Sequence, residues 1–108
     1  MEKNTITVLI VDDNAEYAGI LQHNLQTFPG TKFEVLIARN RDEVTGILRQ
    51  NGNVDIILMD YYLPDGNGLQ ITRTIYESER PIPIILLTSG KDFRIAIEAM
   101  KYGVEEYL

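Results

Sequence analysis

The chain contains no cysteine and no tryptophan, and His23 is its only histidine among 108 residues. Without cysteine there is neither a disulfide nor thiol chemistry, so we expect a protein of a reducing compartment, the cytoplasm. A zinc site is excluded as well, because one histidine cannot supply the usual Cys and His ligands. Ser89 has no paired histidine, and a hydrolase triad would therefore lack its base.

Basic residues are also scarce, and long apolar runs are missing. Ten Lys and Arg stand against 16 Asp and Glu, a formal net charge of −6. Nucleic-acid binding needs a basic face, so we do not expect it of this segment. No stretch reaches membrane-spanning length, and residues 1–5 are too polar for a signal peptide, so no membrane partner is expected. A hydrophobic content of 44% is ordinary for one globular domain.

Three apolar runs without helical spacing predict strands that are buried on both faces of a parallel sheet. They span residues 6–11, 54–59 and 84–87. Residues 33–37 alternate between apolar and partly polar side chains, which predicts a half-buried edge strand. Residues 104–108 are expected to form a fifth strand.

Four helices are expected between these strands. Asn14 and Asn40 are candidate N-caps for the first two, Asn67 or Gly68 begins the third, and the fourth spans residues 91–102. The side chains expected to face the core are, helix by helix, Tyr17, Leu21, Leu25 and Phe28; Val44, Ile47 and Leu48; Leu69, Thr72, Ile75 and Tyr76; and Phe93, Ala96, Ile97 and Met100.

This alternation of strands and helices predicts an α/β fold, a doubly wound five-stranded parallel sheet with helices on both faces. Ligands bind such sheets at the carboxyl ends of the strands, where the chain reverses direction. Asp12 and Asp13 follow the first strand, Asp60 ends the third, and Thr88 follows the next interior strand. We therefore expect these residues to meet at one edge of the sheet.

Three carboxylates in one crevice repel each other unless a cation is present. An all-oxygen ligand set suits Mg²⁺. An aspartate at a strand end beside Mg²⁺ is a reasonable nucleophile toward phosphorus, which would give an aspartyl-phosphate. Thr88 could donate a hydrogen bond to a phosphoryl oxygen.

Each of these residues also has a simpler interpretation. Asp12 and Asp13 could simply mark a helix start, where acidic residues interact favourably with the helix dipole. Asp60 could simply be a turn-forming residue, and Thr88 could simply bond its own backbone. His23, in the middle of a helix, is expected to be a solvated surface residue. The simpler interpretation is less convincing when it must hold at all three strand ends together.

At this point the sequence resembles a response regulator receiver domain of the CheY-like family, over essentially the whole chain. Asp12-Asp13 resembles the family's acidic pair, and Asp60 lies in the segment LMDYYLPDGNG, which matches its Asp-x-x-Leu/Met-Pro-x-x-x-Gly motif. Thr88-Ser89 matches the Thr/Ser-small pair, and residues 103–108 (GVEEYL) resemble the lead into the fifth strand.

The resemblance implies a flavodoxin-like strand order 2-1-3-4-5 and a role in two-component signal transduction. It implies that Asp60 accepts a phosphoryl group from a sensor histidine kinase or a phosphotransfer protein. Mg²⁺ would be held by Asp13 and Asp60, by Asp12 through water, and by the backbone carbonyl of Tyr62. Thr88 would bind the phosphoryl group, and Tyr107 would be the aromatic residue whose rotamer follows it.

The family pattern continues with Tyr-Leu-x-Lys-Pro and a fifth helix, whereas this sequence stops at Leu108. We therefore expect residues 1–108 to be a C-terminally truncated receiver domain that lacks the family's lysine and its last helix. One face of the sheet would then be left uncovered, and we expect self-association through that face.

Two other functions stay open on the sequence alone. A phosphohydrolase similar to haloacid dehalogenase-like enzymes also forms an aspartyl-phosphate, but it needs a second Asp two residues after the nucleophile, where this chain has Tyr62. A module that keeps the fold and only docks partners would not need all of Asp12, Asp13, Asp60 and Thr88.

Overall fold

The computed structural model describes residues 5–50, 53–60, 62–63, 66–77, 82–87 and 106–107. Within these ranges a parallel five-stranded sheet runs in the order β2-β1-β3-β6-β7. Its strands are β1 (Thr5–Val11), β2 (Lys32–Ala38), β3 (Ile56–Asp60), β6 (Ile84–Leu87) and β7 (Glu106–Tyr107). The predicted α/β fold with strand order 2-1-3-4-5 is confirmed.

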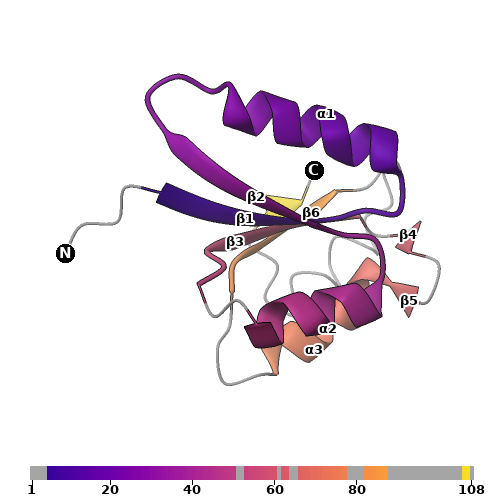
Figure 1. The fold of residues 1–108 in the computed structure, drawn as a ribbon. Coiled ribbons are helices and arrows are strands. Elements are labelled where there is room, and N and C mark those ends of the chain that lie inside the picture. The colour runs from indigo at the N-terminus through magenta and orange to yellow at the C-terminus, as the bar shows by residue number, and fades with distance from the viewer. Residues whose placement is uncertain are drawn as a thin grey trace.

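Helices cover both faces of this sheet (Figure 1). α1 (Ala15–Gln26) lies on one face, and α2 (Arg41–Gln50) and α3 (Gly68–Tyr76) lie on the other. This is the arrangement that right-handed crossovers demand when the chain reverses direction after β2. The helix predicted over residues 91–102 lies outside the described residues. None of the helices that the structure describes has the length and hydropathy needed to cross a membrane.

Two hydrophobic clusters lie on opposite sides of the sheet, and β1 contributes to both. Leu9 and Val11 join the cluster beneath α2 and α3, while Val8 and Ile10 join the cluster beneath α1. All four side chains are buried. An interior strand must be apolar on both faces, which explains the uninterrupted run in the sequence. Full burial of each such side chain contributes roughly 1.5–3 kcal/mol.

The inward face of α1 differs from the prediction. Tyr17 is 44% exposed and Phe28 is 58% exposed, so the expectation that both are buried is wrong. The helix buries Ala18 instead, with Leu21 and Leu25 packed beside it at the i, i+3, i+7 positions of one stripe. Tyr17 lies one residue off this stripe, and α1 ends at Gln26, before Phe28.

The predictions for α2 and α3 are confirmed where their side chains are described. The side-chain oxygen of Asn40 accepts a hydrogen bond from the Glu43 N–H at 2.9 Å, so Asn40 caps α2. Val44 is buried, and Ile47 and Leu48 pack against the same cluster. In α3, which begins at Gly68, Thr72 and Ile75 are buried as expected.

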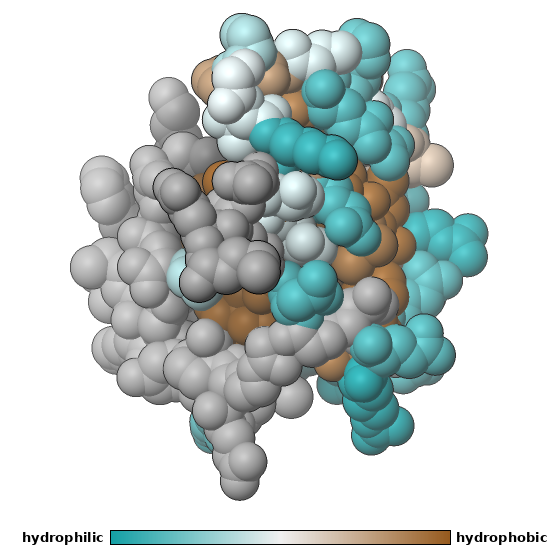
Figure 2. Space-filling model, turned by 60° about the vertical axis from the view of Figure 1, so that its left-hand side comes forward, coloured by the Kyte–Doolittle hydropathy of each residue, from teal (hydrophilic) through white to brown (hydrophobic). Residues whose placement is uncertain are grey.

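The two faces of the sheet are unequally covered by the described residues. On β3, Ile57 and Met59 are fully buried beneath α2 and α3, whereas Ile56 and Leu58 on the α1 side are only half-buried. Figure 2 turns the left-hand side of Figure 1 toward the viewer, and it shows hydrophobic surface between the hydrophilic side chains. Self-association through the α1 side stays a prediction.

Candidate metal centre

Adjacent strands bring three aspartates to the carboxyl edge of the sheet. Asp12 and Asp13 directly follow β1, and Asp60 is the last residue of β3. β1 and β3 are parallel neighbours in which Val11 pairs with Met59, so both strands end at the same level. The Asp12 N–H donates to the Ala38 carbonyl at 2.9 Å, which extends the β1–β2 ladder by one residue. Backbone pairing therefore fixes where the acidic pair begins.

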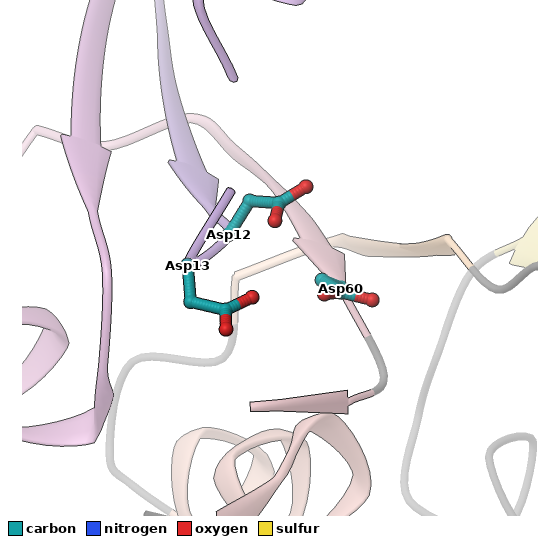
Figure 3. A group of neighbouring side chains, drawn as sticks. All are labelled: Asp12, Asp13 and Asp60. Carbon is teal, nitrogen blue, oxygen red and sulfur yellow. The ribbon is translucent and has the colours of Figure 1, made fainter. Parts of the chain in front are cut away.

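The three carboxyl groups lie around one small space (Figure 3). One carboxylate oxygen from each of Asp12, Asp13 and Asp60 can be chosen so that all three lie within 4.8 Å of one another. Asp12 is buried at 4% exposure, Asp60 is half-buried and Asp13 is exposed. The cluster thus has a buried side and a side that is open to solvent.

Burial makes the negative charge of Asp12 unfavourable. Loss of solvent raises the pKa of Asp12, and the nearby charge of Asp13 raises this pKa further. A hydrogen bond of 2.9 Å from the Asn14 N–H to an Asp12 carboxylate oxygen opposes both effects but does not cancel them. A bound cation would reverse this balance, because it would favour the ionised form of every carboxylate around it.

The residues present fit a hard divalent cation. All three donors are carboxylate oxygens, the ligand type that Mg²⁺ prefers, and Asp13 gives the site access from solvent. Mg²⁺ has octahedral coordination and usually binds only one or two protein carboxylates directly. Even with a cluster of three carboxylates, positions would therefore remain for water and for a phosphate oxygen. The predicted convergence of Asp12, Asp13 and Asp60 is therefore confirmed, and their use as ligands stays a prediction.

Comparison with known proteins assigns the chain to a known family. The family model of the response regulator receiver domain matches residues 8–108, which include all three aspartates. The chain belongs to that family. It is thus a receiver, the phosphoryl-accepting module of two-component signal transduction, and receivers are generally signalling switches and not enzymes.

Relatives and solved structures agree with this assignment. The transcriptional regulatory protein CitB of Klebsiella pneumoniae is 31% identical over 105 residues, which cover 97% of this chain and 44% of CitB. DpiA of Escherichia coli K12, also a transcriptional regulatory protein, is 28% identical over 95% of this chain and 45% of its own length. The receiver thus spans less than half of either relative.

Among solved structures, a response regulator receiver domain protein from Clostridium thermocellum superimposes on this receiver with a TM-score of 0.85. The two are 30% identical, and the match covers 95% of this chain and 80% of that one. The agreement therefore extends from the sequence motifs to the arrangement of the whole sheet.

The remaining predicted site residues are described in part. Tyr62 lies in β4 (Tyr62–Leu63), two residues after Asp60, and its use as a carbonyl ligand stays a prediction. Tyr107 lies in β7, paired with Leu86, but its side chain is outside the description, as is all of Thr88. His23 is exposed on α1, which confirms the expectation of a solvated residue.

One feature of the receiver's site was missed by sequence reasoning. The segment after Asp60 contains the antiparallel pair β4 and β5 (Gly66–Asn67), in which Leu63 pairs with Gly66. Strands of two residues carry no hydrophobic periodicity, so the pattern could not reveal them. The available signal was Pro64-Asp65-Gly66, because Pro, Asp and Gly in succession favour a tight turn.

The raised pKa of Asp12 predicts a stability cost for the metal-free receiver. The pKa of Asp12 in the folded state lies above its value of about 3.9 in the unfolded chain. The protonated carboxyl therefore stabilises the fold fully at low pH, and this contribution is lost as pH rises through the pKa of the folded state. Asp12→Asn removes this loss and keeps an oxygen for the Asn14 N–H. Urea unfolding in EDTA should therefore show the variant more stable than wild type at pH 7, with the difference gone below about pH 4. If the two proteins differed in stability by the same amount at both pH values, the raised pKa of Asp12 would not be the cause.

Proposed function

We propose that this receiver accepts a phosphoryl group on the Asp60 carboxylate from a sensor histidine kinase or a phosphotransfer protein. The observation that carries the proposal is the convergence of Asp12, Asp13 and Asp60 within 4.8 Å at the carboxyl edge of the sheet. Family membership supplies the reaction class, and the cluster supplies a candidate acceptor. Phosphorylation changes the local charge, and this change is the signal.

In the transfer, a carboxylate oxygen of Asp60 attacks the phosphorus of a phosphohistidine. The new O–P bond forms as the P–N bond breaks, and the imidazole nitrogen keeps the electron pair. The product is an acyl phosphate on Asp60 and an unphosphorylated histidine. Only an ionised Asp60 can attack, so the step needs the carboxylate form in a cluster whose members repel one another.

Mg²⁺, the cofactor we assign to the site, would neutralise charge on the phosphoryl oxygens and on the carboxylates. Asp13 and Asp60 would hold it directly and Asp12 through water, with the Tyr62 carbonyl as a further ligand. The buried position of Asp12 and its bond from Asn14 keep that carboxylate in one orientation. Thr88 would donate to a phosphoryl oxygen, and Tyr107 would change rotamer in response; both roles are part of the proposal.

The proposal makes the receiver a switch without substrate turnover. A phosphohydrolase of the haloacid dehalogenase type would place a second carboxyl two residues after the nucleophile, and the residue there is Tyr62. A phenol with an ordinary pKa near 10 is a poor substitute for that acid and base at neutral pH. Hydrolysis of the aspartyl-phosphate then lacks a carboxyl acid and base at position 62, and self-catalysed dephosphorylation is at most slow, which leaves the phosphorylated state time to signal.

Labelling with a small phosphodonor tests the proposal. The receiver is incubated with acetyl phosphate in Mg²⁺ or in EDTA, and the phosphorylated fraction is measured by intact mass. We expect one phosphoryl group per chain in Mg²⁺ and none in EDTA. A folded chain that is unlabelled in Mg²⁺, or labelled equally in EDTA, would contradict the proposed role of the cluster.

A further inference from the structure

A buried hydrogen bond joins α3 to the residue before Asp60. The Thr72 hydroxyl donates to the Met59 Sδ at 3.5 Å, and both residues are 0% exposed. This distance is suitable for a thioether, which is a larger and weaker acceptor than oxygen. Among the described residues only Thr7 and Asp12 are other polar side chains buried in this way. Buried hydroxyl groups are therefore few among the described residues.

The acceptor of this bond, Met59, is the residue directly before Asp60 in β3. Met59 pairs with Val11 of β1 on one side and with Leu86 of β6 on the other. Asp60 is the next residue, and the chain then passes through β4 and β5 into α3. The buried contact between Met59 and Thr72 thus joins the end of β3, just before Asp60, to α3.

Packing alone does not explain why residue 72 is a threonine. Valine has nearly the same shape and would fill the same space without removing a hydroxyl from water. Methionine has a flexible side chain with three rotatable bonds, so its shape in a core is weakly determined by packing. A donor aimed at its sulfur restricts that freedom, and it does so at the residue whose backbone leads into Asp60.

We propose that Thr72 is a positioning residue for the acidic cluster. By holding the Met59 sulfur it fixes the end of β3 against α3, and with it the place of the Asp60 carboxylate relative to Asp12 and Asp13. Functional constellations need their groups held to within about 0.5 Å, and this contact is one of the supports that does so. The inference rests on the proposed function, in which Asp60 shares a divalent cation with Asp12 and Asp13.

Four variants separate positioning from packing. Thr72→Val keeps the shape and removes the donor, while Thr72→Ser keeps the donor and removes a methyl group. Met59→Leu removes the acceptor at similar volume, and the fourth variant combines Met59→Leu with Thr72→Val. For each protein, calorimetry measures the Mg²⁺ affinity and urea unfolding measures the stability. Intact mass measures the rate at which acetyl phosphate labels the protein.

We expect Thr72→Val to weaken Mg²⁺ binding about threefold to tenfold, less than the roughly 10- to 100-fold lost with partners that bond a metal ligand directly. Thr72→Ser should stay within about twofold of wild type in affinity, although the methyl-sized cavity makes it the less stable variant. Affinity and stability would then rank the two variants in opposite order, which a purely structural role cannot produce. In the Met59→Leu background, Thr72→Val should cause no further loss of affinity.

Three results would overturn the inference: wild-type Mg²⁺ affinity in Thr72→Val, affinities that follow stability across the series, or an undiminished effect of Thr72→Val when Met59 is leucine. If Thr72→Val did not fold, Met59→Leu alone would decide, because a volume-conserving core substitution is tolerated; wild-type affinity there would refute the role. A wild-type receiver that binds Mg²⁺ without being labelled would refute the proposed function, and the affinity ratios would still test Thr72.

Discussion

Replacing Asp60 with asparagine is expected to abolish phosphorylation while the fold stays intact. An amide has no carboxylate oxygen to attack phosphorus, so the labelled fraction should fall from its wild-type level to undetectable. The side chains have the same shape, and the change removes one of the three clustered negative charges. The metal-free variant should therefore stay folded. Intact-mass labelling with acetyl phosphate and urea unfolding measure the two effects.

Asp42→Asn is the matched control, because Asp42 is an exposed carboxylate in the first turn of α2. It removes the same charge from the chain without touching the cluster, and its labelling should equal that of wild type. Persistent labelling of Asp60→Asn, at His23, Ser89 or another aspartate, would show that the acceptor is not the residue at the end of β3.

Asp13→Ala is expected to weaken Mg²⁺ binding by at least about tenfold, because loss of a direct ligand should cost no less than loss of a partner that only supports one. Asp13 is the exposed member of the cluster, so its removal should change the fold little. Calorimetric titration measures the affinity. Binding should also weaken on acidification, as protons compete for the carboxylates, and the raised pKa of Asp12 starts this loss at a higher pH than for an ordinary aspartate.

Glu16→Ala separates ligation from the general field of negative charge. Glu16 is exposed in the first turn of α1, three residues from Asp13, and lies outside the acidic cluster. Its removal should change Mg²⁺ affinity by less than about twofold, since exposed charges are screened by salt. Unchanged affinity in Asp13→Ala, or an equal loss in Glu16→Ala, would remove Asp13 from the ligand set.

The sheet and its acidic edge could be predicted from the sequence because both follow from strong local patterns. Uninterrupted apolar runs fit only strands that are covered on both faces, and the residue after each run is then at the carboxyl edge. Asp12, Asp13 and Asp60 needed no further information to be placed together. Their spacing in the sequence is irrelevant, because strand pairing and not chain proximity brings them close.

Other features depended on packing that the sequence does not display. The helical spacing of Tyr17 and Phe28 with the leucines of α1 predicts a core position for both aromatic residues. The stripe that faces the sheet instead includes Ala18, whose small side chain gives little signal in the sequence. Thr72 was expected to be buried, but its bond to Met59 depends on how α3 seats against β3. Such contacts are decided by the relative position of whole elements, which no local pattern specifies.

The position of the phosphoryl group tests the central claim most directly. Borohydride reduces an aspartyl-phosphate to homoserine, so the labelled receiver can be reduced, digested and sequenced by tandem mass spectrometry. The account predicts homoserine at position 60 alone, and only after labelling in Mg²⁺. Homoserine at position 12 or 13, or a phosphohistidine at position 23 with no homoserine at all, would contradict it.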